Sequence, residues 1–97
     1  MREYDRDPAN EAENLRRHGV HFHDAIVALL DPFAVGWFDE DHSIDERRFV
    51  TVGRDLRGRL LAVVTSESRA RSRIISARRA TKRERDAYEV QLPLGPG

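Results

Sequence analysis

Five consecutive apolar residues, Leu60–Val64, constrain the fold of this chain more than any other segment. Successive side chains of a β-strand point to opposite faces of the sheet, so a strand that is apolar throughout must be covered on both sides. The segment therefore predicts the central strand of a sheet. With 97 residues, of which 39% are hydrophobic and 35% are charged, the chain can build one thin core around that strand, which makes it a single domain.

Two helices are predicted before this strand. Asp7-Pro8 combines a preferred N-cap residue with proline at the first helical position, and Gly19 suits the position just after a helix end. The second helix has apolar residues at positions 22, 25, 26, 29 and 30, the spacing of a stripe that faces a core. Asp31-Pro32 ends it, because a residue before proline disfavours the helical conformation.

Strands and one more helix are predicted in the rest of the chain. Alternation and turn residues predict strands at residues 1–5, 33–38, 48–54, 59–66 and 71–79. Thr81 and Glu84 form a capping box that starts a last helix, which runs to about Val90. The sequence therefore predicts an α+β fold: two N-terminal helices against a mostly antiparallel sheet of four to five strands, and a closing C-terminal helix. The domain spans residues 1–92, and the proline- and glycine-rich residues 93–97 form a flexible tail.

The net charge of zero conceals a strong division of charge along the chain. Residues 1–53 carry six basic and twelve acidic residues, whereas residues 54–85 carry eleven basic and three acidic ones. Ten of those eleven cations are arginine, whose planar group of donors binds phosphate at two points. This half of the chain therefore indicates a site for a polyanion, with RNA as the favoured ligand. A solvated, salt-bridged face is the alternative interpretation.

The composition also indicates which cellular compartment to expect and whether the chain holds a metal ion or cofactor. There is no cysteine, no run of about 18 apolar residues and no charged-then-apolar leader, so we expect a cytoplasmic protein that does not cross a membrane. His18, His21 and His23 do not complete the four-ligand set of a structural zinc site. No metal ion or other cofactor is therefore predicted.

The junction between the last predicted strand and the last helix carries the most specific arrangement of charge. Arg78 and Arg79 end the strand, and the free N–H groups at the start of the capped helix also attract phosphate. Strand geometry alone would send the two side chains to opposite faces. A turn after Ala77 would bring both to the start of the helix, which is the arrangement that a shared site requires.

In the order and spacing of several short elements, the chain resembles the BrnT family, the toxin half of BrnT–BrnA type II toxin–antitoxin pairs. These elements span nearly the whole chain: Asp7-Pro8, Asn14, Arg17–Val20 with Phe22, Asp31-Pro32, His42-Ser43, Glu46–Phe49, Gly58–Leu61, and Ile74–Glu84 followed by Tyr88. The resemblance implies a RelE-like fold and a ribonuclease that arrests translation. It also implies neutralisation by a BrnA-like antitoxin, which would bind operator DNA in an autoregulatory complex, and it allows a heterotetramer with that antitoxin.

A metal-independent endoribonuclease needs a base for the attacking 2′-hydroxyl, cations on the phosphate and an acid for the leaving oxygen. Arg78 and Arg79 are the candidates for stabilising charge in the transition state. His18 is the candidate for proton transfer, although it suits a helix C-terminus equally well, and His42 is the second candidate. Further contacts with RNA are assigned to six residues: Arg17, Arg54, Arg59, Lys82, Arg83 and Tyr88.

Several alternatives stay open beside the enzyme. Tyr88 and Trp37 are more often core or interface residues than platforms on which a base stacks. A salt bridge to the acidic N-terminal half is the competing role of Arg78 and Arg79. The whole chain could also be a module that binds nucleic acid or its antitoxin without cleaving RNA.

Overall fold

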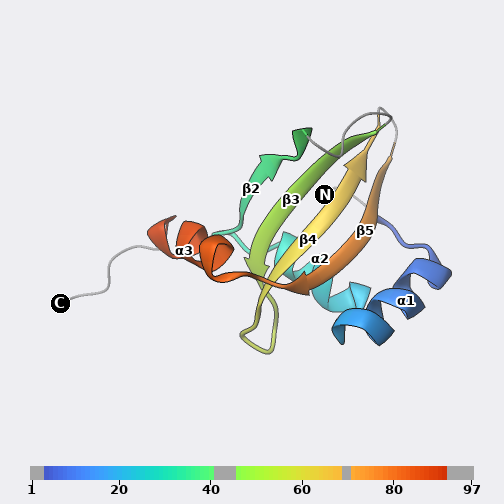
Figure 1. The fold of residues 1–97 in the computed structure, drawn as a ribbon, viewed down its shortest axis with the longest axis horizontal. Helices are drawn as coiled ribbons and strands as arrows, with labels where there is room; N and C mark the ends of the chain where they lie inside the picture. The colour runs from blue at the N-terminus through green and yellow to red at the C-terminus, as the bar shows by residue number, and fades with distance from the viewer. Residues whose placement is uncertain (1–3, 41–45, 69–70, 92–97) are drawn as a thin grey trace.

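The computed structural model describes residues 4–40, 46–68 and 71–91 of the chain. Its elements follow the predicted order: β1 (Tyr4–Asp5), α1 (Pro8–His18), α2 (Phe22–Leu29), β2 (Val35–Phe38), β3 (Arg47–Arg54), β4 (Leu60–Glu67), β5 (Ser72–Arg79) and α3 (Lys82–Gln91). The strands form one sheet with the helices around it (Figure 1), so the α+β prediction is confirmed. Residues 1–3 of the first predicted strand and the predicted tail at 93–97 lie outside the described residues.

The five strands lie in the order β1-β5-β4-β3-β2. β1 pairs with β5 in parallel, and every other pair of neighbours is antiparallel, as the sequence predicts. β4 is the middle strand, and its Leu61, Ala62 and Val63 are fully buried. The apolar run therefore occupies the place where both faces of the sheet are covered.

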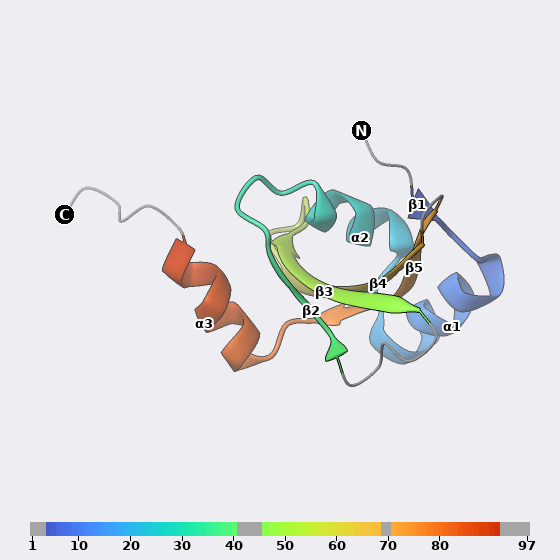
Figure 2. The same ribbon diagram turned by 90° about the horizontal axis from the view of Figure 1, so that it is seen from above.

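Two apolar clusters occupy the two faces of the sheet, and Figure 2 shows α2 across one face and α3 beside β2. On one face, α2 packs three side chains against β4 and β5: Phe22, Ala25 and Ala28. On the other face, α3 lies over β2 and β3 and buries a single residue, Tyr88. The buried contact between the last helix and the sheet therefore depends on one large side chain.

α1 is attached along the edge of β5 by a buried asparagine. The side-chain amide of Asn14 donates hydrogen bonds to the carbonyls of Ala77 and Val20, at 2.8 and 2.9 Å, and its carbonyl accepts one from the N–H of Ala77 at 2.9 Å. Among the residues that the structure describes, β1 pairs with the first two residues of β5, Ser72 and Arg73. Asn14 thus satisfies backbone groups of the strand edge that β1 does not reach.

A glycine sets how closely α2 approaches the sheet. A Cβ atom on Gly53 of β3 would lie 2.0 Å from the carbonyl oxygen of Ala28. Real side chains do not approach backbone so closely, so α2 can lie at its observed distance only with glycine at this position.

The predicted helix boundaries are confirmed by their hydrogen bonds. Asp7 accepts bonds from two N–H groups of the first turn of α1, and Gly19 follows the helix with a left-handed φ of 69°. At the start of α3, the Thr81 N–H donates to the Glu84 carboxylate at 2.9 Å and the Glu84 N–H donates to the Thr81 hydroxyl at 3.2 Å. These two bonds are those of a capping box.

β2 begins at Val35, whereas the sequence predicted a strand from Phe33. The Asp31 carboxylate accepts a hydrogen bond from the Phe33 N–H at 2.9 Å, and the Asp31 carbonyl accepts one from the Ala34 N–H at 3.0 Å. These bonds close a turn over residues 31–34, and a backbone folded into a turn cannot pair as a strand.

Candidate functional site

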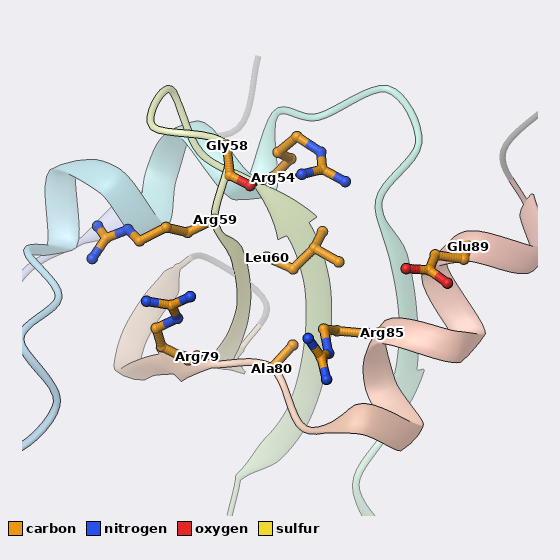
Figure 3. A pocket seen from close by; sticks show the side chains of 8 residues that line it. All are labelled: Arg54, Gly58, Arg59, Leu60, Arg79, Ala80, Arg85 and Glu89. Atoms are coloured by element: carbon orange, nitrogen blue, oxygen red, sulfur yellow. Dashed lines mark hydrogen bonds between the residues drawn. The ribbon is translucent and has the colours of Figure 1, made fainter.

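Four arginine side chains surround one hollow at an end of the sheet, as Figure 3 shows. They come from the end of β3, the residue before β4, the end of β5 and α3: Arg54, Arg59, Arg79 and Arg85. The rest of the lining is formed by Gly58, Leu60, Ala80 and Glu89, and the hollow has a volume of about 390 Å³. We call it the cationic hollow. Antiparallel pairing places the end of one strand beside the start of the next, which is why arginines distant in sequence meet there.

Arg59 is a fixed part of the wall. Its Nε donates to the Asp55 carboxylate at 2.8 Å and its Nη2 to the Asp24 carboxylate at 3.2 Å, and its side chain is 16% exposed. Burial acts to raise the pKa of Asp55, but the N–H groups and guanidinium of Arg59 outweigh it, so the pKa lies below its ordinary value. The charge of Arg59 is therefore already compensated within the protein.

Arg54 is held by a small network around Asp31. Its guanidinium donates to the Gly58 carbonyl at 2.6 Å and lies over the ring of Tyr88, 5.6 Å from the ring centre. The Tyr88 hydroxyl and the Arg54 N–H both donate to Asp31, at 2.7 and 2.8 Å. Burial acts to raise the pKa of Asp31, but these hydrogen bonds and that from the Phe33 N–H hold it below its ordinary value. The network joins α3 to the end of α2.

Arg79 and Arg85 differ from these two arginines. Both side chains are exposed, and neither makes a hydrogen bond or an ion pair with any residue that the structure describes. Two uncompensated guanidinium groups that line one hollow can bind an anionic group such as a phosphate at several points.

Glu89 places a carboxylate on the wall of the same hollow. It lies on α3 four residues after Arg85, so both side chains project from one side of the helix. Sequence reasoning did not single out Arg85 or Glu89. The available signal was the i,i+3 spacing of Arg85 and Tyr88, which faces the sheet, together with the i,i+4 spacing of Arg85 and Glu89.

Arg78 does not share this site. β5 runs without a turn through Arg79, so the two arginines point to opposite faces of the sheet, and the structure does not bring them together. Arg78 instead pairs with Glu84 through two hydrogen bonds, at 2.7 and 3.0 Å. The hydrogen bonds from Arg78 lower the pKa of Glu84, and those bonds raise the pKa of Arg78. Its partner is thus a residue of α3 and not of the acidic N-terminal half.

His18 lies in a different hollow, between α1 and the edge of β5, with Arg17 and Ser76 in its lining. It is the last residue of α1, and the next carbonyl, that of Gly19, lies 3.5 Å from a guanidinium nitrogen of Arg59. His18 is therefore adjacent in sequence to a contact of the cationic hollow, without lining it. His42 lies outside the described residues.

The other residues assigned to RNA are dispersed. Lys82 pairs with Asp86 at 2.9 Å, and Arg83 is exposed on α3. Tyr88 is 2% exposed, so the core position favoured for it is confirmed and its ring is covered by protein. Trp37, by contrast, is 39% exposed on β2 and is not a core residue.

No group of three or more His, Asp or Glu residues in residues 4–40, 46–68 and 71–91 is placed to hold a metal ion. Within the same ranges, no helix has the length and apolar character needed to cross a membrane.

A family model and a solved structure are similar to this chain. The family model described as the ribonuclease toxin BrnT of type II toxin–antitoxin systems matches residues 7–84. The crystal structure of the Brucella abortus ribonuclease toxin BrnT is similar over 84% of this chain and 100% of that chain, with a TM-score of 0.64 and 20% sequence identity. No curated protein matches. At this identity the solved structure supports the fold alone, and the RelE-like classification stays a prediction.

Proposed function

This chain belongs to the BrnT family of ribonuclease toxins of type II toxin–antitoxin systems, and on that premise we propose that RNA is held and cleaved in the cationic hollow. The observation that carries the proposal is the pair of uncompensated arginines, Arg79 and Arg85, beside the carboxylate of Glu89. The hollow contains three of the residues assigned from the sequence: Arg54, Arg59 and Arg79.

The proposed reaction is the metal-independent cleavage of a phosphodiester by its own 2′-hydroxyl. The Glu89 carboxylate takes the proton of that hydroxyl, and the oxygen attacks the adjacent phosphorus. Arg79 and Arg85 donate hydrogen bonds to the phosphoryl oxygens, where negative charge increases in the transition state. The 5′-oxygen leaves with a proton, which gives a 2′,3′-cyclic phosphate and a 5′-hydroxyl.

An acid for the leaving oxygen is the remaining requirement. His18 stays our candidate from the sequence, because an imidazole can donate a proton. It lines the neighbouring hollow, so it can serve only an RNA that extends from the cationic hollow past Arg59. Arg78 has a supporting role in this proposal. Its pair of bonds to Glu84 fixes the start of α3, the helix that carries Arg85 and Glu89.

In the cell, we propose, cleavage of RNA arrests translation until a BrnA-like antitoxin neutralises the toxin. The family assignment supports an antitoxin partner as such. The identity of that antitoxin as BrnA-like, and the binding of operator DNA through it, follow from the same resemblance and are part of the proposal.

The decisive experiment compares two double variants that each remove two positive charges. Purified protein without antitoxin is incubated with end-labelled RNA in EDTA, as wild type, as Arg79→Gln/Arg85→Gln and as Arg16→Gln/Arg57→Gln. Arg16 and Arg57 are exposed, do not line the hollow and are not among the residues assigned to RNA, so that variant controls for loss of charge alone. We expect a loss of cleavage of about 100-fold or more in the first variant and a small loss in the control.

Three results would contradict the proposal. Equal losses in the two double variants would mean that general charge, and not the hollow, supports activity. If EDTA abolished cleavage by the wild type, the metal-independent reaction would be excluded. Binding of RNA by wild type without cleavage would identify the chain as a binding module.

A further inference from the structure

An apolar groove lies beside the cationic hollow and has no partner within the described residues. It is lined mainly by apolar side chains from the end of α2, the turn that follows it and the β3–β4 turn, among them Val27, Leu30, Phe33 and Leu56. Leu30 is 53% exposed, Phe33 41% and Leu56 82%. A single exposed leucine is common on a protein surface, but three large apolar side chains that converge in one groove are typical of an interaction site.

The groove is built on rigid turns. Asp55 accepts hydrogen bonds from the Arg57 and Arg59 N–H groups at 2.9 and 2.8 Å, which fixes the β3–β4 turn and holds Leu56 away from the core. The turn after α2 is closed by the bonds of Asp31 to Phe33 and Ala34. A partner therefore meets apolar side chains that lose little conformational freedom when they are covered.

Arg54 lines both the apolar groove and the cationic hollow. A ligand that fills the groove and continues past Arg54 consequently reaches Arg79 and Arg85. The surface as a whole therefore fits a segment with apolar side chains at one end and acidic side chains at the other. RNA fits the groove poorly, because its sugar–phosphate chain is anionic, and of Leu30, Phe33 and Leu56 only Phe33 has a ring on which a base can stack.

We propose that the antitoxin of this toxin docks an apolar segment into the groove and extends acidic residues over Arg54 into the cationic hollow. The inference rests on the proposed function, because it takes the hollow as the site of RNA. Its occupant is a protein, as a type II system requires, and charge complementarity sets the direction of the segment. Inhibition then follows from occupation of the arginines that would otherwise bind phosphate.

The test compares two double variants of exposed apolar residues. Leu30→Ser/Leu56→Ser removes two walls of the groove, and Leu15→Ser/Val90→Ser removes two apolar side chains, 39% and 84% exposed, that do not line it. The dissociation constant of each for the purified cognate antitoxin is measured by calorimetry. We expect the affinity of the groove variant to fall by about ten-fold or more and that of the control by less than about two-fold.

Two further measurements on the same variants separate this inference from the proposed function. Cleavage of RNA without antitoxin is expected to be equal in the groove variant and in wild type. If wild type cleaves no RNA at all, the proposed function fails, while the comparison of antitoxin affinities still decides the inference. Light scattering gives the oligomeric state of the free toxin.

Each remaining outcome overturns the inference. Unchanged antitoxin affinity in the groove variant places the docking surface elsewhere. A loss of RNA affinity in that variant, with antitoxin affinity retained, assigns the groove to RNA. A wild-type dimer that the groove variant converts to a monomer, again with antitoxin affinity retained, assigns it to a second copy of this chain.

Discussion

Asn14 pairs with Ala77 as a neighbouring strand would, because its side chain binds both backbone groups of that residue, at 2.8 and 2.9 Å. Asn14→Ala would leave these groups and the Val20 carbonyl buried without partners. We expect the free energy of unfolding to fall by about 3 kcal/mol or more, since each buried unsatisfied group costs about 1–3 kcal/mol. Urea unfolding measures the loss. Asn10→Ala, an exposed position on the same helix, is the control, and an equal loss there would contradict this role of Asn14.

Gly53→Ala is expected to be strongly destabilising, by about 3 kcal/mol, because the added Cβ would meet the Ala28 carbonyl oxygen at 2.0 Å and α2 would have to move away from the sheet. Gly36→Ala serves as its counterpart on β2. There the new Cβ would lie 3.2 Å from the Thr51 hydroxyl and 3.3 Å from the Val50 carbonyl oxygen, distances that a small shift can relieve. Thermal unfolding of both variants tests the difference, and similar losses would show that close packing at Gly53 is not the cause.

Tyr88→Phe removes the hydrogen bond to Asp31 and is expected to lower the free energy of unfolding by about 1–2 kcal/mol at pH 7. The pKa of Asp31 lies below its ordinary value of 3.8, so the stability that its charged form contributes is present above that pH and is lost as the pH falls through the lowered pKa. The difference between wild type and variant should therefore shrink below about pH 4. Urea unfolding at pH 7 and pH 3 measures it, and a difference independent of pH would contradict a bond to the carboxylate.

Glu89→Gln separates catalysis from binding. The variant keeps the size of the side chain and removes a negative charge from the cationic hollow, so RNA should bind as tightly as to wild type or more tightly. Cleavage should nevertheless fall by about 100-fold, because the amide cannot accept the proton of the 2′-hydroxyl. Single-turnover rates and filter binding measure the two effects. A rate equal to that of wild type would remove Glu89 from the proposed mechanism.

Binding of RNA should weaken steeply with salt, because each phosphate that is neutralised by an arginine releases a counterion. Arg79→Gln/Arg85→Gln should reduce the slope of log affinity against log salt concentration by about 2, one for each lost contact. Titrations between about 50 and 200 mM salt measure the slope. An unchanged slope in this variant would place the phosphate contacts outside the hollow.

Much of the fold could be predicted because its signals are local. Asp7 and the Thr81–Glu84 pair act within one turn of helix, and Gly19 follows from the conformation of a single residue. The central position of β4 follows from the composition of five adjacent residues. Such features are determined by residues adjacent in the sequence, so the sequence alone is enough to predict them.

The site was harder to predict because it depends on contacts between distant residues. α3 is placed by the bond from Tyr88 to Asp31, which joins residues 57 positions apart, and this placement brings Arg85 and Glu89 to the hollow. Arg78 and Arg79 point to opposite faces of β5, as adjacent residues of a strand do, so they do not form the shared site that a turn after Ala77 would have allowed. The sequence thus showed that the region is cationic, but it did not show which residues line the hollow.

The attachment of α3 by the single buried side chain of Tyr88 has a consequence for the ensemble of molecules in solution. A helix held by one buried side chain and by the half-exposed Arg78–Glu84 pair at its start can detach while the sheet and the first two helices stay folded, so its local stability is lower than that of the whole domain. Because Arg85 and Glu89 lie on this helix, the cationic hollow is complete only in the attached population. A change in the Asp31–Tyr88 anchor would therefore alter the fraction of competent molecules without touching any group that binds RNA.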